Sequence, residues 1–464
     1  MAWPIRGSGP GPYPTYKDSG VSWLGEVPGV WQVSRLKRIC RFVYGDSLPT
    51  ETRQEGNVPV FGSNGCVGFH TAANTHAPCI VIGRKGSFGK VNFSQVPVFA
   101  IDTTYFVDDR YTHADLRWLS YLLVSLKLDG ISKDSAVPGL AREDAYAQHA
   151  AYPASIDEQV AIVRYLDHAD RKVRHAIRAR QQLIKLLTEQ KQAIIQRAVT
   201  RGLDPNVRLK PSGVPWLGDV PEHWEIMPLK RVSRVQGGYA FSSSLFDDHG
   251  VPIVRMTNLK SGRLELAGAP CIPESECVDR FSARVGDLLY GLSGSIGNFG
   301  VVQDKDLPVQ INQRVGRFVP LLSRISSSYL ALVVQTPEFS RQVLDMCTGT
   351  AQLNVSPLDV ERVVITVPSL PEQTAILAYV HDATAILDKA IDAARREIDL
   401  LREYRIRLIA DVVTGKLDVR DVPVPDDETD VLPEDVETID DVDAADQGDD
   451  ATEENSDSSS EERA

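Results

Sequence analysis

Two stretches of this sequence occur twice, in the same order, and this internal repeat limits the possible folds more than any other feature. The segment SGVSWLGEVPGVWQVSRLKRI at 19–39 returns as SGVPWLGDVPEHWEIMPLKRV at 212–232, with twelve of 21 positions identical. A longer pair, 155–204 and 369–418, shares 19 of 50 positions. Because repeated segments mark repeated structural units, the sequence predicts one fold that is used twice.

A third repeated pair lies between these two. The segment GRKGSFG that begins at Gly83 corresponds to GLSGSIG, which begins at Gly291. The offset between the copies grows along the chain from 193 to 208 to 214 residues, which indicates that the second copy carries insertions. Each copy therefore consists of a short leader, a region of unlike sequence and a long terminal segment.

The terminal segments have the pattern of long amphipathic helices. Neither proline nor glycine occurs from Ile156 to Thr200 or from Glu372 to Thr414, and residues at spacings of four and three form a seam typical of a coiled coil. At 1.5 Å per residue each helix would be roughly 65–70 Å long. We expect the two helices to pair antiparallel with each other; pairing with helices of other subunits is the alternative. The predicted seam contains Ile162, Leu166, Ala169, Val173, Ala176, Arg180, Leu183, Leu187, Gln190 and Ile194, and in the second copy Val380, Ala383, Leu387, Ala390, Ala394, Ile398, Leu401 and Leu408.

The regions between leader and helix have the pattern of short strands mixed with helices. Strands are predicted at VPVFG (from Val58), APCIVIG (from Ala77) and VPIVRMTN (from Val251), and helices at LRWLSYLLVSL (from Leu116) and SSSYLALVVQ (from Ser326). The predicted fold class is α+β: two α/β domains separated by an antiparallel coiled coil of two long helices, with a pseudo-twofold internal repeat. The predicted parts are a flexible N-terminus (1–18), a first domain (19–154), a first spacer helix (155–204), a second domain (205–368), a second spacer helix (369–418) and a disordered acidic tail (419–464).

The net charge of −13 is distributed unevenly. Residues 421–464 hold nineteen acidic residues and one arginine, whereas the preceding chain holds 49 basic and 44 acidic residues. A segment so acidic and so poor in apolar residues is expected to be disordered. Two roles are open for it: a solubilising tail, or a competitor for a basic groove that imitates the charge of nucleic acid.

Composition excludes several classes of protein. No apolar run reaches the roughly 18 residues of a membrane span, and the proline- and glycine-rich start lacks the apolar core of a signal peptide. The six cysteines include no Cys-x-x-Cys pair. This pattern argues against a disulfide framework or structural zinc and favours a reducing, cytoplasmic compartment.

Motifs of the common catalytic and cofactor sites are missing. The loop GRKGSFGKV lacks residues that a Walker A loop requires, and its glycine spacing differs from the dinucleotide-binding fingerprint. The sequence also lacks an Asn-Pro-Pro-Tyr-like methyltransferase element and a His-Glu-x-x-His motif. We therefore expect a binding protein with no catalytic residue, no metal site and no cofactor of its own.

Glycine-rich turns that carry basic and amide side chains form the predicted contact surface for nucleic acid. Their glycines let the backbone approach a phosphate closely. Arginine, asparagine and glutamine read base edges, whereas lysine and serine mainly contact phosphates. A hairpin turn that only the fold requires is the alternative for each loop. The candidates are Arg84, Lys85, Ser87 and Lys90 in the first copy, and Arg255, Asn258, Lys260, Arg263, Ser293, Ser295, Asn298, Gln310, Asn312, Gln313 and Arg314 in the second.

The set of ordered motifs resembles the DNA-specificity subunits of type I restriction-modification systems. The resemblance covers residues 13–420. It rests on the leaders YKDSGVSWLGEVPGVW and SGVPWLGDVPEHW, on IVIGRKGSFGKV, and on GTAQLNVSPLDVERVVITVPSLPEQTAI before the last helix. A proline followed by a Glu-Gln pair stands at the start of both long helices, at Glu158-Gln159 and Glu372-Gln373. The long acidic tail departs from the family pattern.

This resemblance implies two target-recognition domains that each read one half of a bipartite, asymmetric site in double-stranded DNA. It implies that the long helices form the spacer and dock two methyltransferase (modification) subunits that methylate adenine. Restriction subunits would translocate and cleave the DNA, and S-adenosylmethionine, ATP and Mg²⁺ would bind in these partners. The alternative function is a coiled-coil scaffold or orphan specificity protein that acts as an adaptor without restriction activity.

Overall fold

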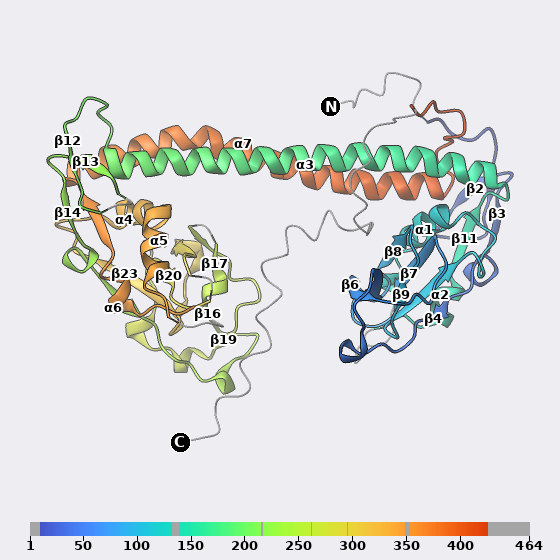
Figure 1. Cartoon of the computed structure of the whole chain (residues 1–464), viewed down its shortest axis with the longest axis horizontal. Helices are drawn as coiled ribbons and strands as arrows, with labels where there is room; N and C mark the ends of the chain where they lie inside the picture. Colours follow the sequence, from blue (N-terminus) through green and yellow to red (C-terminus); the bar gives the residue numbers. More distant parts are fainter. Residues whose placement is uncertain are drawn as a thin grey trace. The chain divides into compact units, whose positions relative to one another are not determined.

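The computed structural model divides the chain into two compact units. Of the described residues, unit 1 contains those up to Arg180 and those from Arg396 onward, and unit 2 contains those from Gln181 to Arg395. The helices α3 (Ile156–Arg201) and α7 (Leu370–Val413) therefore each contribute one part to unit 1 and the other part to unit 2 (Figure 1). The structure describes residues 10–131, 139–214, 217–260, 262–294, 296–348 and 353–425.

A four-stranded antiparallel sheet forms the centre of unit 1. In spatial order its strands are β4 (Val43–Tyr44), β10 (Thr104–Asp108), β7 (Cys79–Gly83) and β8 (Val91–Ser94). Successive residues of a strand point to opposite faces of a sheet. On one face Ile80 and Ile82 belong to the core that contains helix α1 (Leu116–Ser125), and on the other face Cys79 and Val81 belong to the core that contains Phe61. The sheet is therefore covered on both sides.

A three-stranded sheet packs on the second face. In spatial order its strands are β6 (Gly65–His70), β5 (Val58–Gly62) and β9 (Phe99–Ala100). Strand β5 pairs antiparallel with β6 and parallel with β9. The strands predicted from Val58 and Ala77 and the helix predicted from Leu116 are confirmed as β5, β7 and α1.

Unit 2 repeats this arrangement. Its central sheet contains, in spatial order, β15 (Ser233–Gly237), β23 (Val315–Pro320), β20 (Leu288–Gly291) and β21 (Phe299–Val301), and its smaller sheet contains β19 (Cys271–Ile272), β16 (Val251–Val254) and β22 (Gln310–Ile311). Like β5, strand β16 pairs antiparallel with one neighbour and parallel with the other. Helices α4 (Ser327–Val334) and α5 (Pro337–Asp345) share a core with the central sheet. The prediction of one mixed α/β fold used twice is confirmed.

The strand predicted at VPIVRMTN is shorter than expected. Strand β16 ends at Val254, and Met256–Asn258 forms the 3-10 turn η6. The side-chain amide of Asn258 causes this ending, because its oxygen accepts a hydrogen bond from the backbone N–H of Arg255 at 2.9 Å. Such local side-chain bonds compete with strand pairing.

Within each unit the two long helices run in opposite directions. In unit 1 the Arg405 guanidinium of α7 lies 2.5 Å from the Asp170 carboxylate of α3, and Arg180 of α3 donates to Glu397 of α7 at 2.9 Å. In unit 2 the Lys191 ammonium of α3 donates to Asp388 of α7 at 2.6 Å, and apolar residues from the end of α3 and the start of α7 share one core.

The seam predicted for α3 is correct in the first part of the helix and only partly correct in the second, where Leu187 and Ile194 are half-buried. Val173 and Ala176 are buried as predicted, but Leu183 is 45% exposed and Gln190 is also exposed. Ile195, which lies beside the predicted seam, is buried. A straight helix has 3.6 residues per turn and drifts by about 20° per heptad relative to a strict 3.5-residue repeat, so the buried stripe moves to neighbouring positions.

Both ends of the described chain pack into the core of unit 1. Tyr13 is buried, and the backbone N–H of Asp418 donates to the Gly11 carbonyl at 2.7 Å. Val419 is 2% exposed. The expected flexibility of 1–18 is therefore wrong for the part from residue 10 onward, and the expected disorder of 419–464 is wrong up to residue 425. The remaining residues of both predictions lie outside the described part of the chain.

The two leaders make the same contacts in their units. The Lys17 ammonium donates to the Gly29 and Trp31 carbonyls, and in unit 2 Lys210 donates to the carbonyls of the equivalent residues, Glu222 and Trp224. Trp31 and Trp224 are both buried and anchor the leaders, whereas Trp23 is half exposed. The lysine contacts hold together the two strands of each leader, β1 with β2 and β12 with β13.

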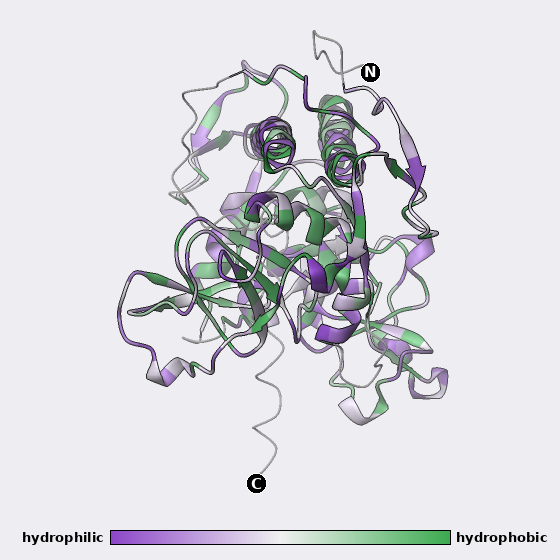
Figure 2. Ribbon diagram, turned by 90° about the vertical axis from the view of Figure 1, so that its right-hand side faces the viewer, coloured by the Kyte–Doolittle hydropathy of each residue, from purple (hydrophilic) through white to green (hydrophobic). Residues whose placement is uncertain are grey.

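The remaining strands and helices connect these parts. Figure 2 shows hydrophobic residues along the strands of the sheets and hydrophilic residues in many connecting loops. Within the described residues, none of the helices combines the length and the apolar character needed to cross a membrane. The connecting elements are β1 (Tyr16–Asp18), β2 (Glu26–Pro28), β3 (Gln32–Arg35), α2 (Arg142–Ala147), β11 (His149–Tyr152), β12 (Leu209–Pro211), β13 (Asp219–Pro221), β14 (Glu225–Pro228), β17 (Leu259–Lys260), β18 (Arg263–Leu264), α6 (Pro357–Val360) and β24 (Val364–Val367).

Candidate nucleic-acid interface

Several loops meet at one end of the central sheet in unit 1 and are joined by backbone hydrogen bonds. The N–H of Gly45, after β4, donates to the Thr104 carbonyl at 3.1 Å, and the N–H of Arg84, in the β7–β8 hairpin, donates to the Thr103 carbonyl at 2.8 Å. The Arg84 carbonyl in turn accepts from the N–H of Leu140 at 2.9 Å. We call residues 44–46, 84–90, 101–103 and 139–142 loop cluster 1.

Unit 2 contains the same cluster at the same end of its central sheet. The N–H of Gly238 donates to the Val315 carbonyl at 3.0 Å, and the N–H of Leu292, in the β20–β21 hairpin, donates to the Arg314 carbonyl at 2.9 Å. The Leu292 carbonyl accepts from the N–H of Val355 at 2.9 Å. We call the described residues among 237–239, 292–298, 312–314 and 353–355 loop cluster 2.

Glycines shape both clusters. A Cβ atom at Gly45 would lie 2.1 Å from the Ile101 carbonyl oxygen, and one at Gly238 would lie 2.2 Å from the Asn312 carbonyl oxygen. No side chain fits at these two positions, because the backbone of each glycine packs directly against the backbone of the neighbouring turn. Each hairpin also needs two glycines with positive φ, Gly86 and Gly89 in unit 1 and Gly294 and Gly297 in unit 2. The predicted glycine-rich loops are therefore hairpin turns whose glycines the fold itself requires. A role of these loops in binding nucleic acid stays a prediction.

The candidate residues of cluster 1 differ in how far they are available for binding. Lys85 and Ser87 are exposed at the tip of the hairpin. Lys90 is half-buried, and its ammonium donates to the Asn64 side-chain oxygen at 3.2 Å. Lys85 and Ser87 are therefore the members of this set that can meet a ligand without breaking an internal contact.

Arg84 belongs to an aromatic and cationic group that the sequence did not reveal. Its guanidinium lies 5.2 Å from the centre of the Tyr44 ring, and that of Arg142 lies 5.1 Å from the same ring. The Tyr105 hydroxyl donates to the Leu140 carbonyl at 3.0 Å. Burial, and then the neighbouring Tyr44, raise the pKa of Tyr105 well above 10, so this hydroxyl stays protonated as a donor. No local motif links these residues, because they lie far apart in the sequence.

Cluster 2 presents fewer free side chains than predicted. Ser293 is 4% exposed, and its hydroxyl lies 2.5 Å from the Asn354 side-chain oxygen. Asn298 and Arg314 are half-buried, and Gln313 is exposed. Gln313 is therefore the best-placed candidate in this cluster, while Ser295 lies outside the described residues.

Two amides predicted to read bases are used inside the fold. The Gln310 oxygen accepts from the Val278 N–H at 3.3 Å, and its nitrogen donates to the Ser282 hydroxyl at 2.7 Å. The Asn312 oxygen accepts from the N–H of Arg314 at 3.1 Å. These contacts make Gln310 and Asn312 positioning residues for the turn.

The candidates from Arg255 to Arg263 lie on a separate loop beside β21. The N–H of Gly262 donates to the Phe299 carbonyl at 3.0 Å, which joins this loop to the β20–β21 hairpin. Asn258 is 9% exposed and its amide nitrogen donates to the Glu265 carbonyl at 2.9 Å, so it holds the loop in shape. The exposed Arg263 pairs with the Glu265 carboxylate at 3.2 Å. The other two candidates on this loop are Arg255, whose guanidinium lies 4.9 Å from the centre of the Phe246 ring, and the half-buried Lys260.

The two clusters share their backbone pattern and differ in their side chains. Hydrogen bonds of the same kind connect equivalent positions in both units, with lengths that agree within about 0.1 Å. The side chains at these positions differ in charge, size and hydrogen-bonding groups. The equivalent pairs are Asp46 and Tyr239, Arg84 and Leu292, Lys85 and Ser293, Asp102 and Gln313, and Thr103 and Arg314.

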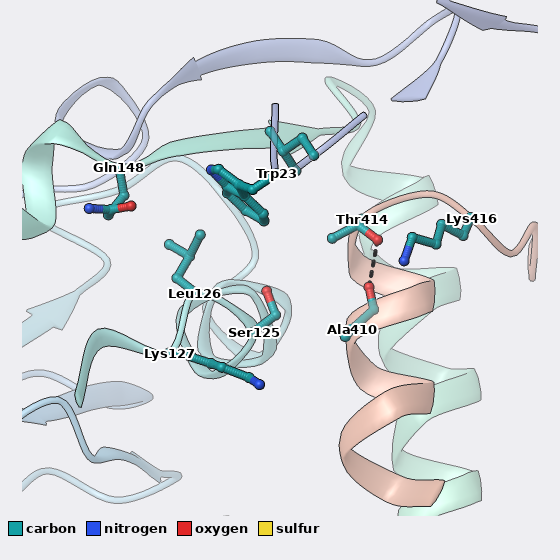
Figure 3. Close-up of a pocket in the computed structure, with 9 residues that line it drawn as sticks. Trp23, Ser125, Leu126, Lys127, Gln148, Ala410, Thr414 and Lys416 are labelled. Atoms are coloured by element: carbon teal, nitrogen blue, oxygen red, sulfur yellow. Dashed lines mark hydrogen bonds between the residues drawn. The ribbon is translucent and has the colours of Figure 1, made fainter. Parts of the chain in front are cut away.

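A cavity of about 380 Å³ lies elsewhere in unit 1. Figure 3 shows Trp23 and Leu126 on one side of it and the end of α7, with Thr414 and Lys416, on the other. Its lining contains no carboxylate, histidine or cysteine. Among the described residues no group of three or more potential metal ligands occurs. The cavity marks the place where the leader meets the end of α7, and it contains no acid–base pair.

Comparison with known proteins gives a consistent result. The model of the type I restriction modification DNA specificity domain matches residues 28–186 and 221–395. The chain is 24% identical over 274 residues to the type I restriction enzyme MjaVIII specificity subunit of Methanocaldococcus jannaschii, which covers 58% of this chain and 62% of that protein. It is 23% identical over 209 residues to the StySPI specificity subunit of Salmonella potsdam, which covers 43% of this chain and 44% of that protein. The chain thus matches about two fifths to three fifths of the length of these relatives.

A solved structure supports the fold assignment. A chain from a study of assembly and conformational transition in a type I restriction-modification system aligns with a TM-score of 0.56 and 15% sequence identity. The alignment covers 84% of this chain and 99% of that chain. Since the family model matches well over half of the sequence in two blocks, one in each copy of the repeat, this chain belongs to the type I restriction-modification DNA specificity family.

Proposed function

We propose that this chain reads DNA sequence as the non-catalytic specificity subunit of a type I restriction-modification complex. The observation that carries the proposal is the pair of loop clusters with one backbone pattern and unlike side chains. Side chains distinguish bases, whereas the backbone only positions them. Two such clusters suit two unlike half-sites, so each unit would read one half of a bipartite, asymmetric site.

The long helices would form an antiparallel coiled coil that sets the distance between the half-sites. The opposite directions of α3 and α7 within each unit, and the ion pairs between them, support this role. At 1.5 Å per residue, a helix of this length would span roughly 65–70 Å, or about 20 base pairs at 3.4 Å each. Bases opposite the helices would remain unread.

The chemical steps would take place in partner subunits in the cytoplasm. Two methyltransferase subunits with S-adenosylmethionine would methylate adenine, and restriction subunits with ATP and Mg²⁺ would translocate and cleave DNA. Family membership supports this assignment, as do the curated relatives, which are specificity subunits of type I restriction enzymes.

Within this proposal the exposed candidates carry the contacts to DNA. Lys85 and Ser87 in cluster 1 and Gln313 in cluster 2 are the first choices, because they are exposed. Glutamine can bind adenine in the major groove, and lysine, which mainly contacts phosphates, can also bind guanine there. The remaining proposed contacts are Arg84, Lys90, Arg255, Lys260, Arg263, Asn298, Ser295 and Arg314, with Ser293 and Asn258 as residues that position the loops.

Sequencing that detects DNA methylation can test this proposal in one experiment. The host strain would carry a deletion of the gene, complemented by the wild-type chain, by Lys85→Ala or by Gln313→Ala. We expect the wild type to restore methylation at one bipartite motif. Lys85→Ala should relax the preference in one half of that motif, and Gln313→Ala should relax it in the other half.

The matched control is Gln182→Ala on the exposed side of α3, which should leave the motif unchanged. Methylation that is unaffected by deletion of the gene would contradict the proposal. A change in the same half-site by both Lys85→Ala and Gln313→Ala would contradict the assignment of one half-site to each unit.

A further inference from the structure

A Leu-Lys-Arg turn occurs in both units outside the loop clusters. In unit 1 it forms the 3-10 helix η1 (Leu36–Arg38), and in unit 2 it forms η4 (Leu229–Arg231). The two turns occupy equivalent positions in the two leaders, 193 residues apart in the sequence. Each turn lies a few residues before the first strand of its central sheet, β4 in unit 1 and β15 in unit 2.

The two turns are held in the same way. Leu36 and Leu229 are each 0% exposed and anchor the turns in the core. The N–H of Leu36 donates to the Gln148 carbonyl at 2.8 Å, and the N–H of Leu229 donates to the Val363 carbonyl at 2.8 Å. The following lysine and arginine are therefore presented from a fixed backbone in both units.

The four cations of these turns are exposed, and their side chains have no partner among the residues that the structure describes. Lys37 and Arg38 are exposed in unit 1, as are Lys230 and Arg231 in unit 2. Among the described residues, no hydrogen bond, ion pair or cation–π contact involves any of the four side chains. Packing and stability of the units thus do not account for the presence of two adjacent cations at this position.

Whether a side chain is the same in both copies distinguishes a contact to phosphates from a contact to bases. A protein that reads two unlike half-sites needs different side chains wherever it meets bases, but it can use the same side chains wherever it meets phosphates, which carry no sequence information. The loop clusters differ, as Lys85 and Ser293 illustrate, whereas the Lys-Arg pair is the same in both units. This pattern is the one expected of a phosphate contact.

The chain also limits the distance between each Lys-Arg pair and the loop cluster of its unit. Gly45 lies seven positions after Arg38 in unit 1, and Gly238 lies seven positions after Arg231 in unit 2. Such a segment spans at most about 25 Å. The pair and the loop cluster lie toward opposite ends of the first strand of each central sheet: Gly45 bonds to Thr104 at one end of β10, whereas Arg41 bonds to Tyr111 beyond the other end. One duplex would therefore contact both only if it extended along that strand.

We propose that Lys37 with Arg38, and Lys230 with Arg231, bind the phosphodiester backbone of duplex DNA, one pair at each half-site. The inference rests on the proposed function and adds a sequence-independent contact to it. Each pair fixes the position of its unit on the duplex and adds affinity without choosing bases. Two copies of one protein partner would also favour identical surfaces, and the experiment distinguishes that possibility.

The experiment measures binding of the full chain to a duplex of random sequence over a range of salt concentrations. The variants are Lys37→Gln with Arg38→Gln, and Lys230→Gln with Arg231→Gln. Each lost phosphate contact lowers the slope of log affinity against log salt by about 0.9, so each double variant should lose roughly 1–2 in slope. The control, Arg171→Gln with Lys172→Gln, removes two exposed cations of α3 that have no counterpart in the second copy, and its slope should stay close to that of the wild type.

The outcomes separate the inference from the function on which it rests. A wild-type chain without salt-dependent binding to duplex DNA would overturn both. If the wild type binds duplex DNA with a salt-dependent affinity and both double variants keep its slope, the inference alone is overturned. A loss of methyltransferase binding without a change in slope would also overturn the inference alone. The methylated motif supplies a second readout, because the variants should lower the extent of methylation without altering its sequence.

Discussion

At the scale of single residues, a Glu-Gln pair at the start of each long helix bonds to other parts of its unit. The Glu158 carboxylate accepts a hydrogen bond from the indole of Trp31 at 2.8 Å, and Glu372 accepts one from Trp224 at 3.1 Å. The glutamine that follows each glutamate bonds to backbone groups of its own unit. These side chains join the leader to the long helix, which explains why the pair stands at both junctions.

The carboxylate of Glu372 gives the second unit a dependence on pH. Burial by itself raises its pKa, but hydrogen bonds from His223, Ser369 and Trp224 outweigh burial and lower the pKa of Glu372 from 4.5 to about 2. A carboxyl with a lowered folded-state pKa stabilises the fold above its unfolded pKa and loses this contribution as the pH falls toward the folded pKa. We expect Glu372→Gln to be less stable than the wild type at neutral pH and to converge with it between pH 4.5 and 2.

Thermal unfolding across this pH range measures the effect. Glu222→Gln is a suitable control, because the Glu222 side chain is 60% exposed and lies 3.9 Å from Arg208. Its difference from the wild type should stay small at every pH. A gap between Glu372→Gln and the wild type that stays constant from pH 7 to pH 2 would show that these hydrogen bonds do not depress the pKa.

The sequence predicted the positions of the Glu-Gln pairs but not their contacts. Two hydrogen-bond partners of the pair in unit 1, Trp31 and Asp115, lie 127 and 44 positions away in the sequence. The same holds for Tyr44 and Arg142 at loop cluster 1, since no local pattern brings them together. Conversely, Asn258 and Gln310 have the right chemistry for reading bases, and only burial reveals that they serve the fold.

At the scale of secondary-structure elements, a buried ion pair joins the long helices in unit 1. The Asp170 side chain is 7% exposed and that of Arg405 is 11% exposed, and Arg174 lies 2.7 Å from the same carboxylate. The pair of Arg180 and Glu397 also joins α3 to α7, but these side chains are 38% and 52% exposed. The chain thus provides a buried and an exposed pair in one interface.

Removing one partner of each pair should have very different effects. Asp170→Ala leaves the buried arginines without a counter-charge, and the loss of a buried partner costs about 3–5 kcal/mol. Glu397→Ala breaks an exposed pair, which contributes at most about 1 kcal/mol. Urea unfolding of both variants measures the difference, and equal losses of stability would contradict the role given to the buried pair.

The sequence predicted these elements better than it predicted their packing. The absence of proline and glycine was sufficient to predict both long helices. The strict heptad seam placed Leu183 and Gln190 in the interface, and both are exposed because the helix keeps its own period. Strand runs bounded by proline and glycine were found, whereas the parallel pairing of β5 with β9 depends on contacts between distant segments.

At the scale of the whole molecule, the first unit is built from both ends of the chain. Its core includes Leu408, Ile409, Val412 and Val413 of α7 as well as Trp31 and Ile162. The sequence suggested domains that follow one another along the chain, because a repeat is read in order. The contact between Gly11 and Asp418 joins segments that no periodic pattern connects.

Two truncations should separate the packed end of the chain from the acidic tail. A chain that ends at Val413 loses the Gly11–Asp418 bridge, the buried Val419 and the Arg420 side chain, which lies 4.9 Å from the centre of the Tyr13 ring. We expect a clear fall in its unfolding temperature. A chain that ends at Pro425 keeps these contacts and should unfold like the full-length protein.

Binding to duplex DNA at low salt gives the second measurement for the chain that ends at Pro425. If the tail competes for the DNA-binding surface, its removal should raise the affinity for duplexes of any sequence. Unchanged affinity would leave the solubilising role. Destabilisation by the shorter deletion would contradict the predicted disorder of the acidic tail.

The shared construction of unit 1 has a consequence during protein synthesis. A ribosome releases the chain from its N-terminus, so the residues of unit 2 all emerge before the last packing partners of unit 1. Unit 1 is therefore the first unit to be synthesised in part and the last to have all its core residues. The apolar residues around Trp31 lack their packing partners from α7 while the second unit can already fold. Incomplete cores of this kind are prone to aggregation, and the interval before the final residues emerge is when the nascent chain depends most on chaperones.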